Sequence, residues 1–565
     1  MGQIQYRIAI VGEISEQQES LRHKLSARLM EIQGCLQQLG TEEYEYSACF
    51  LTAAEELSGV WKTIREENQI KTIYLPMAEN PAKNKGNLMN GDRHVLARIS
   101  DMADLVLGFW NEDTVGEEAY ICQIFYYCME KGVPCLWISK KDEREYWGES
   151  ILFEPFQDDI LKKYLSSMLR GKKEETVKDG LLWGNRLIEW GGKSYRKMLK
   201  KFAPMPSDES VWVDHMMDET TVLPDYTGET LRTTFLKKYQ RYDRRAVELA
   251  QRYRGSIYWR SVLPLAATVL LSIGFYGDAV SKAVSSILLG KEIVPVPVFQ
   301  LMSYAFFLHG MMTLFSHLLA KSKTIQNWHT GFLYHRMMAE ILRFYIHVIP
   351  FGITMPLKEV LSKSGYDLES NRQVYIKIWH ILHENQVEMP AYQPENASEF
   401  LHVMKDYLHE QVSYHKRSVD RYQKLWLRLH KLESCLMAVG IATVILRGVA
   451  QFFIIGVNSR LIIFAPGVVL PGYVGSLANM IAMVIPAAAA YYTGKLTLFG
   501  FEDNIAIDQL MLKRLEKAIK LVGSIEEREL DYAMLHSLAQ QLGVLLMGEV
   551  AGWNQEMAKR KIKGL

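Results

Sequence analysis

Four long, almost uncharged stretches constrain the fold of this 565-residue chain more than any other feature. They lie between Arg260 and Asp278, between Glu292 and Lys321, from about Ser434 to Val457 and within Leu461 to Gly494. The first has seventeen residues, roughly 25 Å as a helix against a hydrocarbon core of about 30 Å. Tyr258, Trp259 and Arg260 can complete it, because aromatic rings favour the membrane interface and arginine reaches back to water. We therefore expect four transmembrane helices, at about residues 259–280, 296–320, 434–457 and 472–494.

The charges beside the first stretch predict its orientation. Basic residues crowd the segment before it, whereas the loop after it carries little charge; they are Lys237, Lys238, Arg241, Arg244, Arg245, Arg252 and Arg254. Basic residues concentrate on the cytosolic side, and an even number of spans returns a chain to the side where it started. Both termini are therefore expected in the cytosol. The competing interpretation is that the stretches are buried helices of a large soluble protein, which the short first stretch allows.

Overall charge and cysteine content exclude some classes of partner and site. The chain has 65 basic and 64 acidic residues, a net charge of +1, so no overall field recruits nucleic acid. Its six cysteines form no CxxC pair, which predicts free thiols in a reducing compartment. Five histidines lack metal-ligand spacing and are interpreted as packing or interface residues rather than metal ligands: His309, His317, His335, His415 and His430.

The first part of the chain alternates between two patterns. Apolar runs at residues 4–12, 46–53, 70–76, 103–110 and 132–139 are separated by segments with helical spacing. This alternation predicts an α/β domain with a Rossmann-like parallel sheet over residues 1–145. Asp104, at the start of the fourth apolar run, is interpreted as closing the preceding turn. Residues 146–234 are polar and irregular, and predict a helical or irregular linker.

The remainder is predicted to be all-α, with four transmembrane helices and long cytosolic helices. Two units of helix, two spans and helix, at residues 235–350 and 413–565, flank a cytosolic helical connector at 351–412 that is expected to pack near the amino-terminal domain. An amphipathic helix follows each pair of spans, which predicts packing between neighbouring helices. The two apolar faces comprise Tyr334, Met337, Met338, Ile341, Tyr345 and Val348, and Leu512, Leu515, Ile519 and Val522.

The helical part resembles a known family in four segments. They are "AVELAQRYRGSIYWRSVLPLAA", "NWHTGFLYHRMMAEILRFYIHVIPFG", "YHKRSVDRYQKLWLRLHKLE" and "MGEVAGWNQEMAKRKIKGL". They resemble the SLATT group (SMODS and SLOG-associating transmembrane proteins) over about residues 235–565. This resemblance implies a bacterial inner-membrane effector of antiviral or conflict defence, in which a soluble sensor detects a nucleotide signal and the membrane part forms a pore or perturbs the bilayer.

The amino-terminal part resembles the SLOG domain, a Rossmann-like nucleotide-sensing fold, over roughly the first 140 residues. The matching fragments are "RIAIVGE", "KTIYLPMAENP", "DMADLVLGFWNEDTVGEEAY" and "KGVPCLWIS". The resemblance implies ligand-binding residues in the loops after the first and fourth strands, at Gly12, Glu13, Asn111, Glu112, Gly116, Glu117 and Glu118. The implied ligand is a nucleotide or an NAD-derived molecule, and no cofactor is certain.

The same loops depart from the motifs of that family. The first strand leads into "VGEIS" rather than Gly-His-Arg, and the fourth into "FWNEDTVGEEAY" rather than a glycine-rich loop. Related phosphoribohydrolases place a glutamate where this chain has Tyr120 or Ile124, depending on the register, which disfavours such a hydrolase. Three interpretations of the acidic loop remain open: it binds ribose hydroxyls or a base edge, it contacts a basic partner surface, or it is a scaffold without ligand.

These observations together predict a membrane sensor-effector without catalytic residues. The alternatives are a membrane-anchored enzyme that hydrolyses nucleotides or NAD, with Glu117 or Glu118 acting as in TIR-type domains, and an inactive scaffold that docks a separate enzyme. The expected partners are the lipid bilayer, further copies of the chain, and a nucleotide second messenger or the enzyme that makes it. Small residues on the fourth span predict close helix contact between copies, at Gly475, Ala478 and Ala482.

Arg447 needs a separate explanation, because a guanidinium deep in a bilayer costs about 2.5 to 3.5 kcal/mol. One hypothesis is that Arg447 lines a water-filled path, or donates to carbonyls freed near Pro466, Pro471 or Pro486. The other hypothesis is that the third span is broken and the arginine reaches the outer surface.

Overall fold

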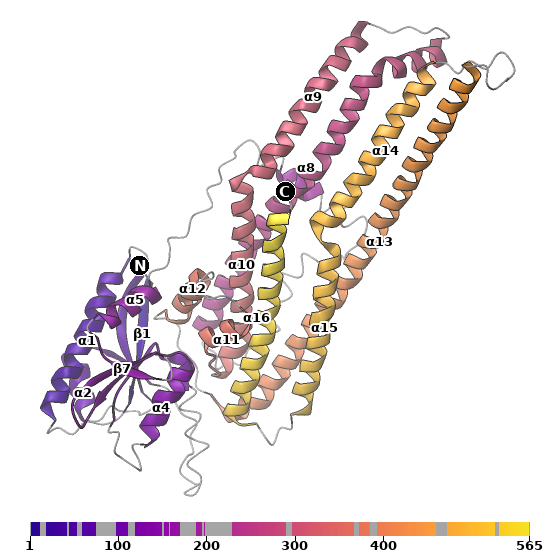
Figure 1. Ribbon diagram of the computed structural model, residues 1–565. Helices are drawn as coiled ribbons and strands as arrows, with labels where there is room; N and C mark the ends of the chain where they lie inside the picture. The colour runs from indigo at the N-terminus through magenta and orange to yellow at the C-terminus, as the bar shows by residue number, and fades with distance from the viewer. Residues whose placement is uncertain are drawn as a thin grey trace.

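The computed structural model describes residues 2–11, 18–41, 44–52, 59–74, 98–110, 119–149, 152–157, 159–169, 188–194, 197, 229–289, 296–365, 372–384, 392–458, 472–525 and 530–563. Figure 1 shows an elongated molecule. An α/β domain lies at one end, and the tips of four long helices lie at the other.

The sheet of the α/β domain has seven strands in the order β3-β2-β1-β4-β5-β6-β7. The strands are β1 (Gly2–Val11), β2 (Tyr44–Thr52), β3 (Lys71–Tyr74), β4 (Leu105–Trp110), β5 (Cys135–Ser139), β6 (Glu145–Gly148) and β7 (Phe153–Pro155). The five predicted strands are present and pair in parallel. The sheet as a whole is mixed, because β6 and β7 add two antiparallel pairs. Only a short turn joins β5 to β6, and so short a connection permits a hairpin but no parallel crossover.

Helices α1 (Glu19–Leu39), α2 (Gly59–Glu67), α4 (Ala119–Glu130) and α5 (Ile160–Leu169) complete this domain. α1 buries a stripe of apolar residues against the sheet: Leu21, Leu25, Leu29, Ile32 and Leu36. Leu161, Leu165 and Leu169 of α5 lie in the same core. The domain therefore extends past the predicted boundary at residue 145, because the sheet needs β6, β7 and α5 to cover its apolar surface.

The rest of the described chain is helical. It contains α8 (Glu229–Leu289), α9 (Val296–Lys321), α10 (Lys323–Val348), α11 (Leu357–Lys363), α12 (Arg372–Leu382), α13 (Ala397–Asn458), α14 (Gly472–Phe499), α15 (Phe501–Ser524) and α16 (Tyr532–Lys563). α8 packs against α9 and α14, and α14 packs against α13, which gives the spatial order α9, α8, α14, α13 (Figure 1). α13 continues as one helix through Arg447. The helix itself is therefore not interrupted there, and the hypothesis that the arginine reaches the outer surface stays a prediction.

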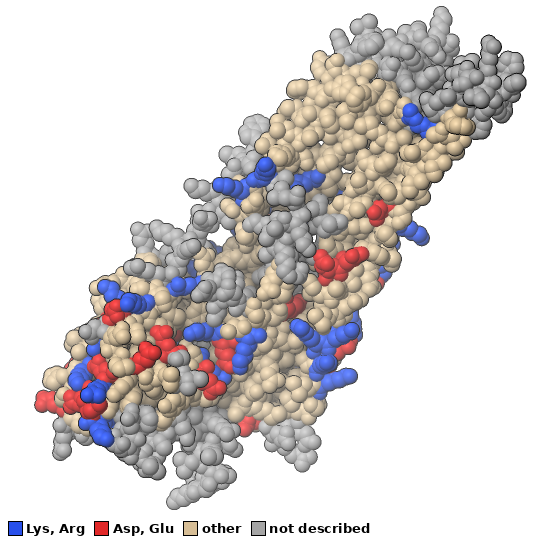
Figure 2. All heavy atoms as spheres, in the orientation of Figure 1, with Lys and Arg blue, Asp and Glu red and all other residues tan. Residues whose placement is uncertain are grey.

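Three helical segments among the described residues are long and apolar enough to cross a membrane: Phe235–Gly277, Ala397–Val449 and Asn479–Ser524. Their charged residues confine the apolar part to one end of each, after Arg260 in α8 and after Glu433 in α13. Only 6% of the apolar window in α13 is buried within the chain. Figure 2 shows the matching half of the molecule almost without charged side chains in its described part. Such a surface requires an apolar environment.

The other half of the helical part has a continuous apolar core. Residues of α8, α10, α12, α13, α15 and α16 contribute to it. Both predicted amphipathic faces lie there: Met338 and Ile341 of α10 and Leu515 of α15 are fully buried. The prediction that these faces pack between helices is confirmed, and this core joins the two helical units.

Candidate functional site

The predicted ligand loops begin at neighbouring strand ends. β1 pairs with β2 on one side and with β4 on the other, so the connections leaving β1 and β4 diverge at this point of the sheet. In open α/β sheets, ligands bind in the crevice outside the carboxyl ends of the strands at such a point. Seven predicted residues belong to the sequence between β1 and α1 or between β4 and α4: Gly12, Glu13, Asn111, Glu112, Gly116, Glu117 and Glu118. They lie outside the described residues, so their role as a ligand site stays a prediction.

Gly108 shows how closely β1 and β4 approach beside these loops. It pairs with Val11, and a Cβ at Gly108 would lie 2.4 Å from the carbonyl oxygen of Val11 and 3.0 Å from the ring of Phe125. A side chain at this position would therefore push the strand ends apart. Glycine is required by the packing of the two strands from which the predicted loops leave.

At the amino ends of the strands, opposite the predicted ligand loops, the buried carboxylate of Asp104 joins the domain to α12. Its Oδ2 accepts a hydrogen bond from the backbone N–H of Arg7 at 2.7 Å. Its Oδ1 accepts one from Nε1 of Trp379 at 2.6 Å and lies 3.2 Å from Nε2 of His383. Asp104 is 6% exposed, and a buried carboxylate of this kind requires such partners. The interpretation of Asp104 as a turn-closing residue therefore omitted its contacts with α12.

The end of α12 also adds to the sheet through its backbone. The N–H of Gln5 donates to the carbonyl of His383 at 3.0 Å, and Ile4 forms an antiparallel bridge with Glu384. The side chain of Arg7 donates to the carbonyl of Leu382 at 2.9 Å. This short addition pairs with residues of β1 that precede its pairing with β4. On their other side the same residues pair with β2.

Trp379 fills the sheet domain's own core. Its side chain is 4% exposed and belongs to the apolar cluster formed by β1, β2, β4, α1 and α5. Nε2 of neighbouring His380 forms a hydrogen bond with the hydroxyl of Tyr46 at 2.9 Å. Burial, followed by the positive charge of Lys377, lowers the pKa of His380 to about 3, so its ring is neutral at physiological pH. The connector is thus part of the domain's fold, and the prediction that it packs near that domain is confirmed.

A second carboxylate of the same edge contacts the helices that surround α12. Oδ2 of Asp101 accepts a hydrogen bond from Thr354 at 2.8 Å and also contacts Nε2 of His536 in α16. The Thr354 hydroxyl in turn lies 2.9 Å from the hydroxyl of Tyr532. Burial opposes a charged His536, but Asp101 outweighs burial and raises the pKa of that histidine. Lys131 adds an ion pair to Glu359 of α11 at 2.8 Å.

Sequence reasoning missed these contacts for an identifiable reason. Asp101 and Asp104 are far in the chain from their partners His536 and Trp379, and the pairs follow no spacing pattern. Their contacts exist only because the amino ends of β1, β4 and β5 face the helices. The described contacts with the helical part therefore lie at the edge opposite the predicted ligand loops.

A second buried charge cluster lies where α13, α15 and α16 meet. Nδ1 of His415 lies 2.9 Å from Asp508 of α15, and Nε2 lies 3.3 Å from Glu549 of α16. His415 is 1% exposed. Burial opposes the charged ring, but the hydrogen bond with Asp508 and the negative charge of Glu549 prevail and raise the pKa of His415 to about 9. The interpretation of His415 as an interface residue is confirmed, and its charge bridges three helices.

We expect the stability of this helix junction to fall as pH rises from about 6.5 to about 9. The pKa of His415 is higher in the folded state, so its contribution is complete below the unfolded pKa of 6.5 and is lost as pH passes through 9. A difference of this size corresponds to about 3 kcal/mol. Thermal unfolding of wild type and His415→Gln between pH 6 and pH 10 checks it. Equal pH dependence in both proteins would contradict the assignment. Nearby Glu340 does not titrate in this range, because Arg336 and Arg343 outweigh burial and lower the pKa of its carboxyl group.

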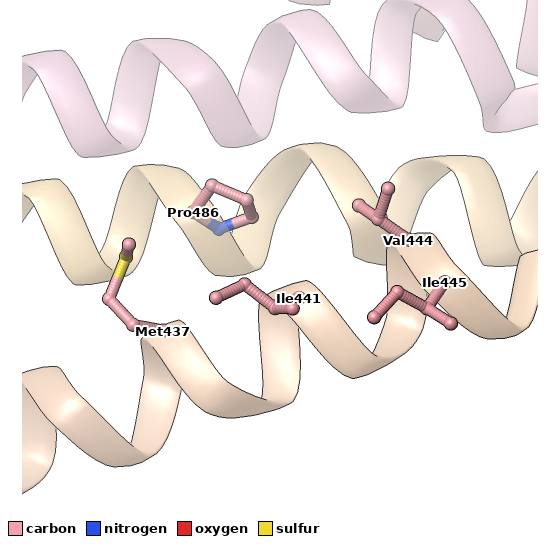
Figure 3. Close-up of a pocket in the computed structure, with 6 residues that line it drawn as sticks. Met437, Ile441, Val444, Ile445 and Pro486 are labelled. Carbon is pink, nitrogen blue, oxygen red and sulfur yellow. The ribbon is translucent and has the colours of Figure 1, made fainter.

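An apolar groove of about 210 Å³ lies between α13 and α14. Figure 3 shows Pro486 of α14 facing Met437 and Ile441 of α13, with Val444 and Ile445 farther along the same helix. A Cβ at Gly440 would lie 3.3 Å from the side chain of Ile485 and 3.6 Å from that of Pro486, so a side chain here would need only a small shift of Ile485. The lining contains no polar side chain, so nothing in it would orient a reacting group.

The predicted intramembrane residues lie in the same two helices. Arg447 is partly buried and lies two helical turns beyond Gly440, about 10 Å along α13. Ala482 of α14 is partly buried. Gly475 and Ala478 belong to α14, but their side chains lie outside the described residues. The pore role of Arg447 and the oligomer role of the small residues stay predictions.

Within the described part of the chain, no group of three His, Cys, Asp or Glu residues is placed to hold a metal ion. Comparisons with protein-family models, with curated proteins and with solved structures found no match. The structure thus defines a class of protein in which an α/β domain is joined, at the amino ends of its strands, to a helical part with membrane-length apolar helices.

Proposed function

We propose that this chain is a bacterial inner-membrane sensor-effector with both termini in the cytosol. The α/β domain binds a nucleotide-derived signal or a partner at the carboxyl edge of its sheet. The helical part responds by opening a pore or perturbing the bilayer. The observation that carries the proposal is the buried junction of Asp101 and Asp104 with α12 and α16, because any displacement of β1 or β4 must move these contacts.

A continuous route connects that junction to the apolar helices. α16 packs against α10 and α11, and α10 follows α9 after the single residue Ser322. Lys238 near the start of α8 pairs with Glu384, directly after α12. Both helices of the first apolar pair are therefore attached to elements that contact the sheet. The resemblance to the SLOG and SLATT groups agrees with this division into sensor and effector.

We include α9 as a fourth membrane helix in this proposal. Eight of its large apolar side chains are exposed in the isolated chain: Tyr304, Phe306, Phe307, Leu308, Met311, Leu314, Phe315 and Leu318. All but Phe306, which packs against Phe275 of α8, share one face of the helix at spacings of three and four residues. A wide exposed apolar face of this kind is typical of a helix whose outer side contacts lipid. A fourth span also returns the chain to the side of the α/β domain, as the shared core of the two helical units requires.

The test uses the full chain. Small molecules released from the purified protein are identified by mass spectrometry and then added to proteoliposomes that hold a fluorescent dye. We expect a nucleotide-derived molecule to bind and to increase dye release. Trp379→Phe removes the N–H that contacts Asp104 but keeps an aromatic ring, so it should bind the molecule and release less dye. Glu117→Gln with Glu118→Gln should lose binding.

Dye release that is independent of the bound molecule, or equal in wild type and Trp379→Phe, would contradict coupling through the junction. Net turnover of NAD by the full chain would favour the enzyme alternative instead.

A further inference from the structure

A short helical segment in the predicted linker is attached to α8 far from both ends of that helix. Residues 188–194 are helical, and Ile188 is 3% exposed within a cluster that includes Leu249 of α8 and Trp328 of α10. The contact is with Gly255, about 40 Å along α8 from its start at 1.5 Å per residue. The chain therefore leaves the sheet domain at Leu169, reaches the middle of α8, and only afterwards enters α8 at Glu229.

Glycines on both segments make this attachment specific. A Cβ on Gly255 would lie 2.1 Å from the carbonyl oxygen of Ile188, and a Cβ on Gly192 would lie 2.8 Å from the carbonyl of Gln251. A Cβ on Gly191 would lie 2.8 Å from the indole of Trp259. Backbones can approach this closely only where side chains are absent. The segment is thus held at one level of α8.

That level coincides with the end of the charged part of α8. Trp190 is 54% exposed, and its ring centroid lies 5.3 Å from that of Trp259. Trp259 precedes Arg260, the last charged residue before Asp278. Tyr258 packs edge-on against Trp259. Tryptophan and tyrosine concentrate at the boundary between the hydrocarbon and water, because one part of each ring system is apolar and another forms hydrogen bonds.

We propose that residues 188–194 are a membrane-surface anchor, with Trp190 inserted among the headgroups of a lipid bilayer. Exposed Lys193 and Lys197 favour anionic headgroups, with Glu189 as the one exposed carboxylate of the segment. This inference goes beyond the sensor function, although it rests on the membrane assignment of α8. Its consequence is that residues 188–194, between the sheet domain and α8 in the sequence, are fixed at the bilayer surface.

The experiment replaces Trp190 of the full chain by the photoreactive residue p-benzoylphenylalanine, in vesicles of phosphatidylethanolamine and phosphatidylglycerol. The same residue at Leu446, 68% exposed in the apolar part of α13, is the positive control. Leu152, 72% exposed in the sheet domain, is the negative control. After irradiation, mass spectrometry identifies what each position has captured.

We expect phospholipid adducts at positions 190 and 446 and no phospholipid adduct at position 152. Capture of a peptide from a second copy at position 190 would overturn the proposal and make this segment an interface between copies. Lipid capture at 446 without capture at 190 would overturn the anchor and leave the membrane assignment intact. Absence of lipid at both positions would overturn the anchor together with that assignment.

Discussion

Replacing Trp379 by alanine is expected to lower the free energy of separating the sheet domain from α12 by about 3–5 kcal/mol, the range for removing a buried tryptophan or phenylalanine. The side chain is 4% exposed in the core of the sheet domain, and its N–H is the 2.6 Å donor to Asp104. The variant therefore loses apolar burial and leaves a buried carboxylate with fewer donors.

Hydrogen exchange at the Gln5 amide measures this loss directly, because that N–H donates to His383. Each 1.4 kcal/mol is a factor of ten, so exchange should accelerate about a hundredfold or more. Trp379→Phe, the matched control, keeps most of the apolar contact and should accelerate exchange less. Unchanged protection of Gln5 in Trp379→Ala would show that α12 is not held by this side chain.

Replacing Glu340 by alanine is expected to destabilise the helical core by about 3–5 kcal/mol, as for buried ion pairs that lose one partner. Glu340 of α10 is 8% exposed and pairs with Arg336 at 2.5 Å and with Arg343. Burial raises the pKa of this carboxyl, but the two guanidinium groups outweigh burial and keep it lowered. Without Glu340, Arg343 retains the neutral amide of Gln411 at 3.4 Å in place of a carboxylate.

Thermal or denaturant unfolding in detergent measures the effect. The matched control removes an exposed carboxylate from the same helical part: Glu516→Ala breaks a 3.9 Å contact with Lys416 between side chains that are 54% and 61% exposed. Such pairs contribute about 0–1 kcal/mol. The double variant Glu340→Leu with Arg343→Met should recover part of the loss, because no unpaired charge stays buried. Equal effects of Glu340→Ala and Glu516→Ala would contradict the role of Glu340.

The pattern of the sequence predicted the elements that depend on local periodicity. All five predicted strands exist because long apolar runs such as those of β1 and β4 can be buried on both faces of a sheet. β6 and β7 were missed, since four and three residues are too short to show a period. The lengths of α8 and α13 were also missed, because the sequence marks where apolar character ends and not where a helix ends.

The candidate site was likewise predictable from the sequence only in part. The loops after β1 and β4 were named from the resemblance to the SLOG domain, and the described ends of these two strands are adjacent. The junction at Asp104 could not be predicted, because its partner Trp379 is 275 residues away and nothing local distinguishes this tryptophan from the others. Long-range polar contacts depend on how the sheet domain and the helices are placed relative to each other. No repeating pattern in the sequence records that placement.

The length of α8 bears on the electrostatic environment of the proposed ligand edge. From Glu229 to Arg260 the helix extends about 45 Å before its apolar part begins. The Debye length at physiological ionic strength is about 8 Å, so the potential of an anionic membrane surface decays several times over that distance. The α/β domain is attached beside the start of α8 through Lys238 and Glu384. Under the proposed function it would therefore meet an anionic signal at its bulk concentration, outside the repulsion that a negatively charged membrane exerts close to its surface.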